Sequence, residues 1–329
     1  MIIEDPKMTT ITQLKTFDKY LDDVREKRDL YQEMLSHKLS PHTKLAYSRD
    51  LKDFFGYFGF EPIPATIKEF LSLTKIDATA LVLKWRNHLS ELGLKESSIS
   101  RKIGSVKAFV KFSNDIGCCE WVLTADALSC TRRVQSYRDT TGVPPTDIKK
   151  ILSFPDRSTF AGKRDYAILQ LLWGNGLRRA EVVSLDIKDV DFSDCSLWIL
   201  GKGKSEKVRV QMNRSTVKAV GEWLTVRIGY KPSDPTALFL SLGGTKRGAR
   251  LTSQSIYNLV DKTSQAVGIS KKMSPHRIRH SAITTVLERN GGNIRKAQSF
   301  SRHLDPRILI IYDDNLKVAQ SEMSDLLEF

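Results

Sequence analysis

The sequence contains no run of about 18 apolar residues, and this lack predicts that no segment spans a membrane. The first residues, M-I-I-E-D-P-K-M, lack the basic segment and the apolar stretch of a secretory signal. Cysteine is scarce, and Cys118, Cys119, Cys130 and Cys195 have neither metal-ligand nor disulfide-framework spacing. Together these absences predict a cytoplasmic protein with reduced thiols.

The chain also lacks the motifs of nucleotide- and metal-dependent enzymes. It has no Walker loop, no carboxylate cluster suited to a pair of metal ions, no internal repeat and no low-complexity segment. Its 329 residues, of which 40% are hydrophobic and 27% charged, are typical of a globular protein with two ordinary domains.

Positive charge is what the sequence has in excess, and it is unevenly distributed. The net charge is +14 at pH 7. Residues 1–135 hold 21 basic and 18 acidic side chains, a net of +3, whereas residues 136–329 hold 31 and 20, a net of +11. A basic domain attracts polyanions because each neutralised phosphate releases a condensed counterion. Nucleic acid is therefore the leading candidate partner.

Helical patterns fill the N-terminal half and indicate a compact domain of four or five helices without strands. We expect helices over residues 10–38, from Ser40 to Phe58, over 77–92 and from about 97 to 117. Ser40 followed by Pro41 is a typical helix start. That helix is expected to bury one apolar face, made of Leu45, Leu51, Phe54, Phe55 and Phe58.

Several basic side chains of this half lie off the apolar faces. They are candidate phosphate contacts, and an ordinary solvated helix surface is the alternative: Lys44, Arg49, Arg101, Lys102 and Lys107. The polar segment 129–145 is the expected linker, because it has no periodicity and ends in Pro144-Pro145. Its Arg132 and Arg133 can lie along a nucleic-acid backbone, although a plain solvated linker fits equally well.

The C-terminal half combines helices with short strands. Helices are expected over 146–154 and 161–174, from Arg178, over 214–229 and 253–267, after Ser274-Pro275, over 293–301 and after Asp305-Pro306. Residues 187–212 alternate as strands, and G-K-G-K-S-E joins the last two as a β-hairpin. The predicted fold is mainly α with a small β-sheet (α+β), with an N-terminal domain over 1–128 and a C-terminal domain over 146–329.

Arg178 follows a glycine-rich turn at the start of a helix, where its guanidinium and the unpaired backbone N–H groups can meet an anion. Glu181 can orient that arginine, and a purely structural Arg178–Glu181 pair is the alternative. Lys202 and Lys204 lie at the hairpin turn. A lysine there can reach into a cleft and donate a proton, but most turn lysines are simply solvated.

Further candidates lie between residues 273 and 315. His276 and Arg279 occupy positions i and i+3 of one expected helix and so project from one face, a pairing that also arises by chance. His280 is one position off that face and is better suited to packing or support. Tyr312 follows His303 among apolar neighbours, where a buried core tyrosine is the alternative.

Taken together, these segments resemble the tyrosine recombinases of the phage-integrase and Xer kind. The matching motifs come in the family's order: G-L-R-R-A-E, G-K-G-K, S-P-H-R-I-R-H, R-H-L-D and I-I-Y-D. The segment S-P-H-T-K-L-A-Y-S-R-D-L near residues 40–51 resembles the family's N-terminal core-binding domain. The resemblance covers nearly the whole chain, and motifs in this order favour the functional interpretation over the structural alternatives.

The resemblance implies site-specific strand exchange on double-stranded DNA through a 3′-phosphotyrosyl intermediate, with two domains that close on the DNA as a clamp. It implies Tyr312 as the nucleophile, His276 as the acceptor of its proton, and Lys202 as the acid for the leaving 5′-hydroxyl. Arg178, Arg279 and His303 would stabilise the phosphate charge, supported by Glu181 and His280. No metal or other cofactor is expected, because the phosphotyrosine ester conserves the bond energy for rejoining.

The sequence departs from this family at one place. The family usually has glycine before the second histidine, as in L-G-H, whereas this chain has S-R-H with Arg302. Since His303 and Tyr312 keep their spacing, we expect the local backbone to differ more than the chemistry. We also expect Arg302 to add a phosphate contact.

The tail from about residue 317 carries an apolar stripe, Val318, Met323, Leu326, Leu327 and Phe329. In the family such a terminal helix often docks on a neighbouring protomer of a DNA-bound tetramer, and we expect a homotetramer here; docking on its own domain is the competing interpretation. An accessory DNA-bending or directionality protein is a candidate partner, and the nucleoid is the expected place of action. Two other functions stay open, namely type IB topoisomerase-like relaxation and non-catalytic DNA-binding regulation.

Overall fold

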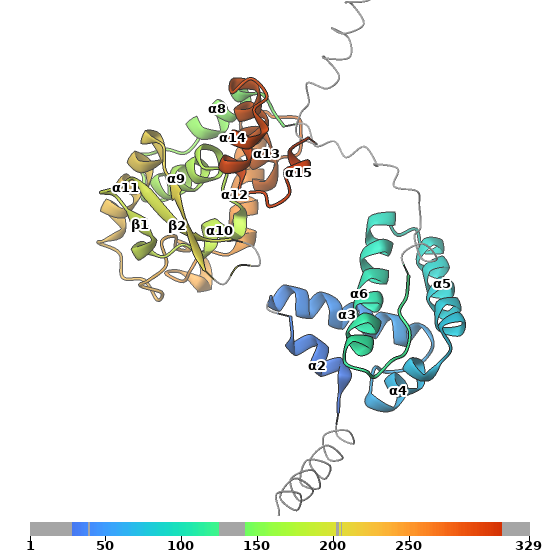
Figure 1. Cartoon of the computed structure of the whole chain (residues 1–329). Helices are drawn as coiled ribbons and strands as arrows, with labels where there is room; N and C mark the ends of the chain where they lie inside the picture. The colour runs from blue at the N-terminus through green and yellow to red at the C-terminus, as the bar shows by residue number, and fades with distance from the viewer. Residues whose placement is uncertain (1–27, 39, 125–141, 202–203, 205, 311–329) are drawn as a thin grey trace, which may run out of the picture. The chain divides into compact units, whose positions relative to one another are not determined.

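The structure, a computed structural model, describes residues 28–38, 40–124, 142–201, 204 and 206–310 (Figure 1). The chain divides into two compact units, Met1–Ser136 and Tyr137–Phe329, and each is considered by itself. Several predicted features lie outside the described residues: Lys202, Tyr312, Arg132, Arg133, the linker up to residue 141 and the tail from residue 317.

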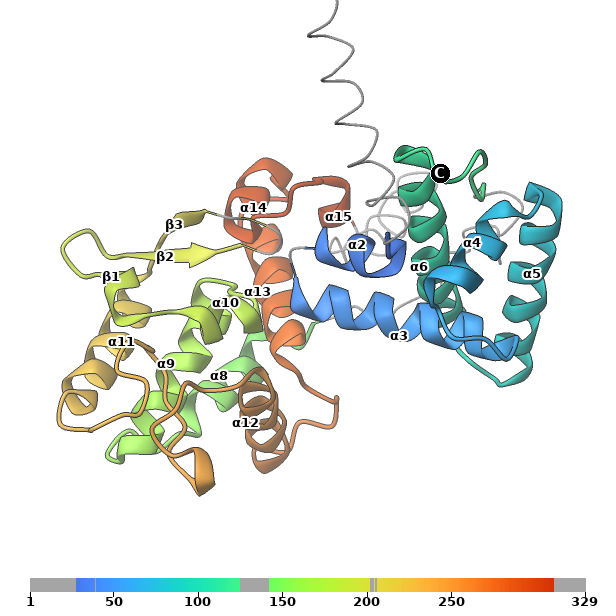
Figure 2. The same ribbon diagram turned by 90° about the horizontal axis from the view of Figure 1, so that it is seen from below.

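The described part of the N-terminal unit is helical throughout. It contains α2 (Leu30–Ser36), α3 (Pro41–Tyr57), α4 (Pro64–Ser72), α5 (Lys75–Glu91) and α6 (Glu96–Asp115), coloured blue to green in Figure 2. The helices predicted from Ser40, over 77–92 and from about 97 are confirmed to within about two residues. Helix α4 is missing from the prediction, because its prolines indicate a break, whereas Pro64 occupies the first turn of that helix.

An aromatic core holds these helices together. The Phe54 ring packs edge to face against Phe55, Phe58, Phe70 and Trp85, with ring centroids between 5.2 and 5.6 Å apart. The prediction that Leu45 shares the buried face of α3 is wrong, since its side chain is 69% exposed. At 100° per residue Leu45 lies about 120° around the helix from Leu51, and so points away from the core.

The C-terminal unit combines eight described helices with one sheet. Its helices are α8 (Pro145–Ser153), α9 (Phe160–Gly174), α10 (Arg179–Ser184), α11 (Arg214–Arg227), α12 (Ser253–Ala266), α13 (Pro275–Arg289), α14 (Ile294–Ser301) and α15 (Arg307–Ile310), with short 3-10 turns at Ile187–Asp189 and Gly244–Lys246. The predicted fold class, mainly α with a small β-sheet, is confirmed. Among the described helices, none combines the length and the hydropathy that a membrane span requires.

Helix α9 is the centre of this unit. It packs against α8, α10, α11, α12 and α13, and its residues from Ala167 to Leu172 are all buried. The run A-I-L-Q-L-L has no polar face, as expected of a helix that is covered on all sides. Because α10 follows directly and α13 packs on α9, the central helix brings the predicted Arg178 and His276–Arg279 segments together.

The sheet carries the predicted hairpin. Strands β1 (Val190–Asp191), β2 (Ser196–Leu200) and β3 (Lys207–Gln211) are antiparallel in the order β1-β2-β3. Leu197 and Ile199 are buried, whereas Trp198 between them is exposed, the alternation expected of a sheet with one covered face. The register pairs Leu200 with Lys207, so the G-K-G-K turn closes the hairpin at the ends of β2 and β3.

Candidate active site

Three of the described candidate residues, Arg178, Arg279 and Arg302, lie at the turn after α9. Gly176 adopts φ +53°, in the left-handed region that favours glycine. A Cβ atom there would lie 3.0 Å from Cε1 of Phe300 on α14, so a larger residue would also force the Phe300 ring to shift. The turn sends the chain into α10 with Arg178 immediately before the helix.

Arg178 is held by the carboxylate of Glu181. Its backbone N–H donates to Oε2 of Glu181 at 2.8 Å, and its Nη1 donates to Oε1 at 2.8 Å. The Glu181 side chain is 2% exposed, whereas that of Arg178 is 29% exposed. The pair considered as the structural alternative is therefore present, but it orients the guanidinium and leaves part of it accessible to an anion.

Helix α13 presents His276 and Arg279 very differently, although they lie at positions i and i+3. The helix begins at Pro275, and Oγ of Ser274 accepts a hydrogen bond from the N–H of Arg277. His276, in this first turn, is exposed. Arg279 is 1% exposed, and its guanidinium donates to the carbonyl oxygens of Gly176 and Ser301. His280, predicted to support the site, is buried at 4% exposure.

Arg302, where this chain departs from the L-G-H pattern, ends α14 in the left-handed conformation, with φ 57° and ψ 33°. Its guanidinium donates to the carbonyl oxygens of Asn175, Phe300 and Gly176 at 3.0 to 3.1 Å, and to Oε2 of Glu181 at 3.2 Å. The phosphate contact expected of Arg302 is not what the structure shows, because the guanidinium is turned into the glycine turn.

The two predicted histidines lie in a strongly positive environment. Burial, followed by the charges of Arg279, Arg178 and Arg302, lowers the pKa of His303 from its ordinary 6.5 to about 4. Loss of surrounding water and the charges of Arg279, Arg178 and Arg277 also lower the pKa of His276, although that side chain keeps an exposed edge. Both imidazoles are therefore neutral at pH 7 in the DNA-free protein.

A titration of the DNA-free protein, followed by NMR, should show the lowered pKa values of both histidines directly. We expect NMR midpoints near 4 for His303 and below 6.5 for His276. Because the unfolded chain binds these protons more readily than the folded one, stability should fall as pH drops from about 6.5 towards 4 and be insensitive to them above about 7. Replacing His303 by asparagine should reduce this pH dependence of stability. A titration midpoint at or above 6.5 for His303 in the native protein would contradict its placement among the arginines.

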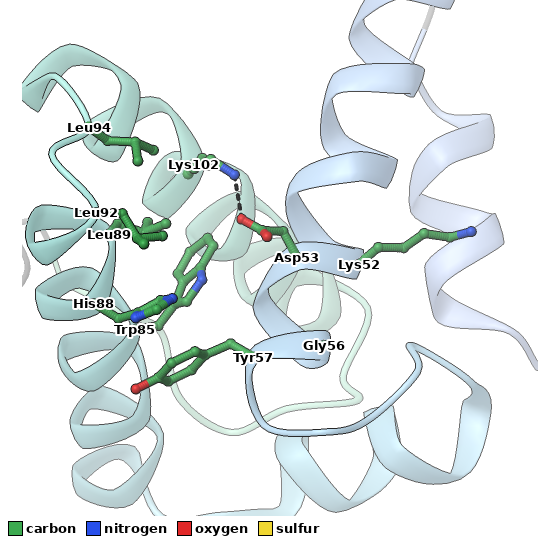
Figure 3. A pocket seen from close by; sticks show the side chains of 10 residues that line it. All are labelled: Lys52, Asp53, Gly56, Tyr57, Trp85, His88, Leu89, Leu92, Leu94 and Lys102. Carbon is green, nitrogen blue, oxygen red and sulfur yellow. Dashed lines mark hydrogen bonds and ion pairs between the residues drawn. The ribbon is translucent and has the colours of Figure 1, made fainter.

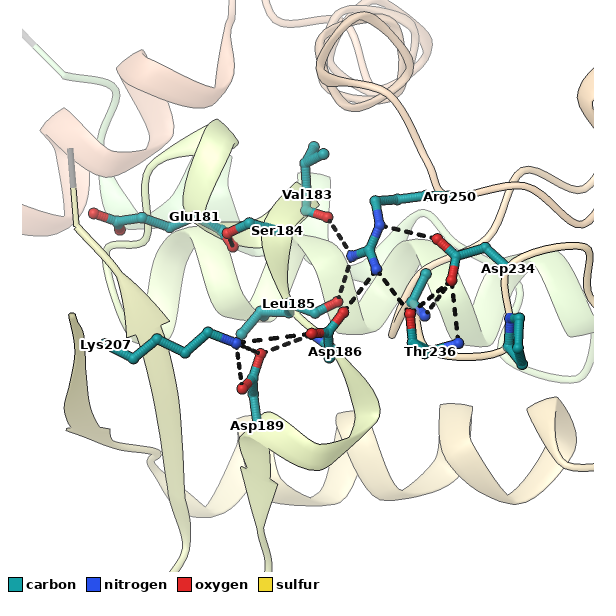
Figure 4. A network of polar contacts seen from close by, with 12 residues as sticks. Glu181, Val183, Ser184, Leu185, Asp186, Asp189, Lys207, Asp234, Thr236 and Arg250 are labelled. Atoms are coloured by element: carbon teal, nitrogen blue, oxygen red, sulfur yellow. Dashed lines mark hydrogen bonds and ion pairs between the residues drawn. The ribbon is translucent and has the colours of Figure 1, made fainter. Parts of the chain in front are cut away.

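A polar network fixes the other end of α10 (Figure 4). The Arg250 guanidinium donates to the carbonyl oxygens of Val183 and Leu185, at 3.1 and 3.0 Å, and to Asp186 at 2.6 Å. Nζ of Lys207, at the start of β3, lies 2.6 Å from both carboxylate oxygens of Asp189. The network thus ties the hairpin that carries the exposed Lys204 to the helix that begins beside Arg178.

Sequence reasoning did not find this network. Its members lie up to 67 residues apart, and an isolated arginine or aspartate in a loop carries no local signal. The D-I-K-D stretch around Asp186 and Asp189 was the one available hint, since it follows α10 directly.

The candidate DNA contacts of the N-terminal unit divide into two groups. Lys44 and Arg49 are exposed on α3, and Lys107 is half-buried on α6. Arg101 is paired with the fully buried Asp50, which also accepts a hydrogen bond from Ser105 at 2.7 Å. Arg101 therefore contributes to the fold of this unit as well as to its positive surface.

Lys102 lies in a pocket of the same unit (Figure 3). Its ammonium group pairs with Asp53 and lies 5.8 Å from the ring of Trp85, next to the stacked rings of Tyr57 and His88. The Lys102 side chain is only 14% exposed. Its charge is thus already neutralised locally, and we rank it below Lys44 and Arg49 as a phosphate contact.

The described part of the C-terminal unit places Arg178 directly after the Gly176 turn and Arg279 against that turn and Ser301, with His276 one turn before Arg279 on α13 and His303 next to Arg302, which also contacts the turn. Lys202 and Tyr312 lie outside that part. Within the described ranges, no group of three or more His, Cys, Asp or Glu is placed to hold a metal ion. The arrangement can bind an anion through fixed positive charge and can take up a proton on a neutral imidazole.

Comparisons with known proteins identify the family of this chain. Residues 143–318 match the model of the phage integrase family, and residues 29–115 match that of the phage integrase N-terminal SAM-like domain. The chain is 42% identical to a tyrosine recombinase of Synechococcus elongatus over 91% of its own length and 92% of the relative's. It is 40% identical to a tyrosine recombinase of Synechocystis over 91% and 95%.

Solved structures support the fold. The Tn1549 transposon integrase in complex with transposon right end DNA superposes with a TM-score of 0.65, covering 91% of this chain and 99% of that one at 20% sequence identity.

Proposed function

This chain belongs to the phage integrase family of tyrosine recombinases, and on that premise we propose that it cuts and rejoins DNA at specific sites through Tyr312. The observation that carries the proposal is that Arg178 directly follows the Gly176 turn, while Arg279 and Arg302, which is next to His303, both donate to the Gly176 carbonyl oxygen. Both similar relatives are named recombinases, which favours this function over topoisomerase-like relaxation or a non-catalytic regulator.

The positively charged side chains of the site are proposed to stabilise the scissile phosphate. A phosphodiester repels nucleophiles, and further negative charge develops on its non-bridging oxygens in the transition state. Arg178 supplies the accessible guanidinium, whose planar fork of N–H donors fits two phosphate oxygens. Arg279 is buried against the Gly176 turn, where the low dielectric of the interior strengthens the attraction between its charge and a phosphate. His303 adds a donor beside them, and catalytic contacts that are long in the free enzyme commonly tighten once substrate binds.

Proton transfer accompanies the exchange of bonds. The Tyr312 oxygen attacks phosphorus, the bond from phosphorus to the 5′-oxygen breaks, and a 3′-phosphotyrosyl ester remains. A tyrosine has an ordinary pKa of about 10 and must lose its proton during the attack. His276, neutral at pH 7 and exposed in the first turn of α13, accepts that proton. Lys202, at the hairpin turn, protonates the departing 5′-oxygen, and reversal of these steps rejoins the strand.

We propose that both units contact the DNA duplex, the N-terminal one as a core-binding domain over residues 1–128 and the C-terminal one as the catalytic domain over 146–329. Exposed basic side chains supply the backbone contacts, with Lys44, Arg49 and Lys204 as the leading candidates. Arg132 and Arg133 of the 129–145 linker extend this basic surface. The protein acts in the cytoplasm, at the nucleoid.

The tail from residue 317 is proposed to join protomers into a tetramer on DNA, since recombination exchanges strands between two duplexes. Removing residues 317–329 should leave the affinity for a single duplex unchanged while reducing recombination by about tenfold or more, because a lost apolar docking surface weakens assembly. Gel-shift and recombination assays on the same preparation measure the two effects. Unchanged recombination by the truncated protein would refute docking between protomers.

Covalent capture of DNA tests the proposed reaction. The protein is incubated with nicked duplexes that carry randomised inverted repeats, so that a short fragment diffuses away after cleavage and the covalent intermediate accumulates. Adducts are recovered under denaturing conditions, their DNA is sequenced, and the modified peptide is identified by mass spectrometry. A peptide that carries the DNA on Tyr312 supports the proposal. Relaxation of a supercoiled plasmid without exchange between two duplexes would favour the topoisomerase-like alternative.

A further inference from the structure

We propose that Arg302 is a positioning residue that holds Arg178 in place through Glu181 and fastens His303 to the turn at Gly176. This role rests on the proposed function, because it matters only where Arg178 and His303 act on a phosphate. It replaces the phosphate contact that the sequence suggested for Arg302, since the guanidinium points into the protein.

The Glu181 carboxylate is shared between two arginines. Its Oε1 accepts from Nη1 of Arg178 at 2.8 Å, and its Oε2 accepts from Nη2 of Arg302 at 3.2 Å and from the Arg178 N–H at 2.8 Å. At 2% exposure, this carboxylate depends on protein donors to replace water. Without Arg302 the carboxylate loses one of its two cationic partners and is expected to rotate, and the Arg178 guanidinium would rotate with it.

The Gly176 carbonyl is likewise shared. It accepts from Arg279 of α13 and from Nη2 of Arg302 at 3.1 Å. Ser301, directly before Arg302, supplies the second carbonyl acceptor of Arg279. Arg302 thereby joins the end of α14, and His303 next to it, to the turn that leads into Arg178. A glycine at this position would leave the backbone path possible but would make none of these contacts.

The backbone conformation of Arg302 supports the positioning role of its side chain. With φ 57°, a residue that carries a side chain sits in a conformation that only glycine adopts freely. Such a conformation persists where surrounding contacts compensate for it. Here the compensation is a set of four hydrogen bonds from one guanidinium.

The substitution Arg302→Gly is the informative test, because it relieves the backbone strain while removing the guanidinium. We expect the single-turnover cleavage rate to fall about 10- to 100-fold, as when a catalytic group loses its orientation. DNA affinity should stay within about twofold, since Arg302 does not reach the phosphate. Arg302→Lys keeps the charge but not the planar fork, and is expected to restore only part of the rate. Arg295→Ala, an exposed arginine on the same helix, is the matched control.

A double-substitution cycle asks whether the effect passes through Glu181. In a Glu181→Gln background, Arg302→Gly should reduce cleavage by much less than it does in the native chain, because the shared carboxylate is already lost. Equal losses in both backgrounds would overturn the proposed route. A large loss of DNA affinity on Arg302→Gly would instead show that Arg302 binds the phosphate.

A measurement without DNA separates this proposal from the proposed function. In the native protein the Arg178 guanidinium should rotate slowly about its Nε–Cζ bond and give separate side-chain N–H signals by NMR. Averaging of these signals in Arg302→Gly, with the Arg295→Ala spectrum unchanged, supports the positioning role even if the chain captures no DNA. Identical Arg178 signals in the native protein and Arg302→Gly would overturn it.

Discussion

Replacing Tyr312 by phenylalanine is expected to abolish covalent capture of DNA while leaving DNA affinity within about twofold. The substitution removes one oxygen atom, the proposed nucleophile, and keeps the ring. An enzyme that loses its nucleophile commonly loses at least about 10⁴-fold in rate, so adduct should fall below detection. The measurement compares adduct on denaturing gels with gel-shift affinity for the same nicked duplex. Tyr257→Phe, a half-buried tyrosine on α12, is the matched control and should react as the native protein does.

The other outcomes of that experiment are equally informative. Adduct formation by Tyr312→Phe would assign the nucleophile to another side chain, and peptide mapping would then identify it. Absence of adduct from the native protein on every duplex of a randomised library would remove support for both cleavage reactions, recombination and relaxation. DNA binding without capture would then favour the regulator.

The second large effect is expected at Arg279, whose side chain should contribute both to the stability of the fold and to the rate of DNA cleavage. Arg279 is 1% exposed, and its guanidinium bridges the carbonyl oxygens of Gly176 and Ser301, which lie 125 positions apart in the chain. Arg279→Lys keeps a positive charge but replaces a planar fork by a single ammonium group, which cannot serve both carbonyls in the same geometry. One of these two buried carbonyl oxygens would lose the hydrogen bond from residue 279.

We expect Arg279→Lys to lower the free energy of unfolding by about 2–4 kcal/mol. The single-turnover cleavage rate should fall roughly 10²- to 10³-fold, because the positive charge proposed to stabilise the phosphate is displaced. Urea unfolding measures the first effect, and cleavage at a temperature where circular dichroism shows a folded protein measures the second. Arg289→Lys, exposed near the end of the same helix, is the control. Native stability together with native cleavage in Arg279→Lys would contradict both the buried bridge and the catalytic role.

Much of the fold follows from local sequence signals. The start of α13 at Ser274-Pro275, the stop of α9 before Gly176 and the G-K-G-K hairpin all depend on residues within about four positions of one another. Such signals act through caps, turns and helix periodicity. They can therefore be predicted from the local sequence, without knowledge of the tertiary contacts. They fail where two local rules compete, as at Pro64, which both breaks the preceding segment and starts α4.

The order of the motifs likewise identified the family from the sequence, since residue types and spacing alone carry that resemblance. It predicted which side chains belong to one site, and the structure places four of the six near one another. The roles of all six stay predictions, and Lys202 and Tyr312 lie outside the described residues.

The exposure and the partners of each of these side chains depend on the tertiary structure. His276 and Arg279 share a helical face by spacing, yet His276 is exposed and Arg279 is 1% exposed, because the turn after α9 and the end of α14 lie against the Arg279 guanidinium. Arg302 points inward because carbonyls more than 100 residues away in the chain lie within its reach. Local sequence sets hydrogen bonds within a helical turn, whereas burial and distant partners depend on how whole elements pack. The sequence thus predicted which residues belong to the candidate site, and packing determined which of them are exposed and which are buried against the turn at Gly176.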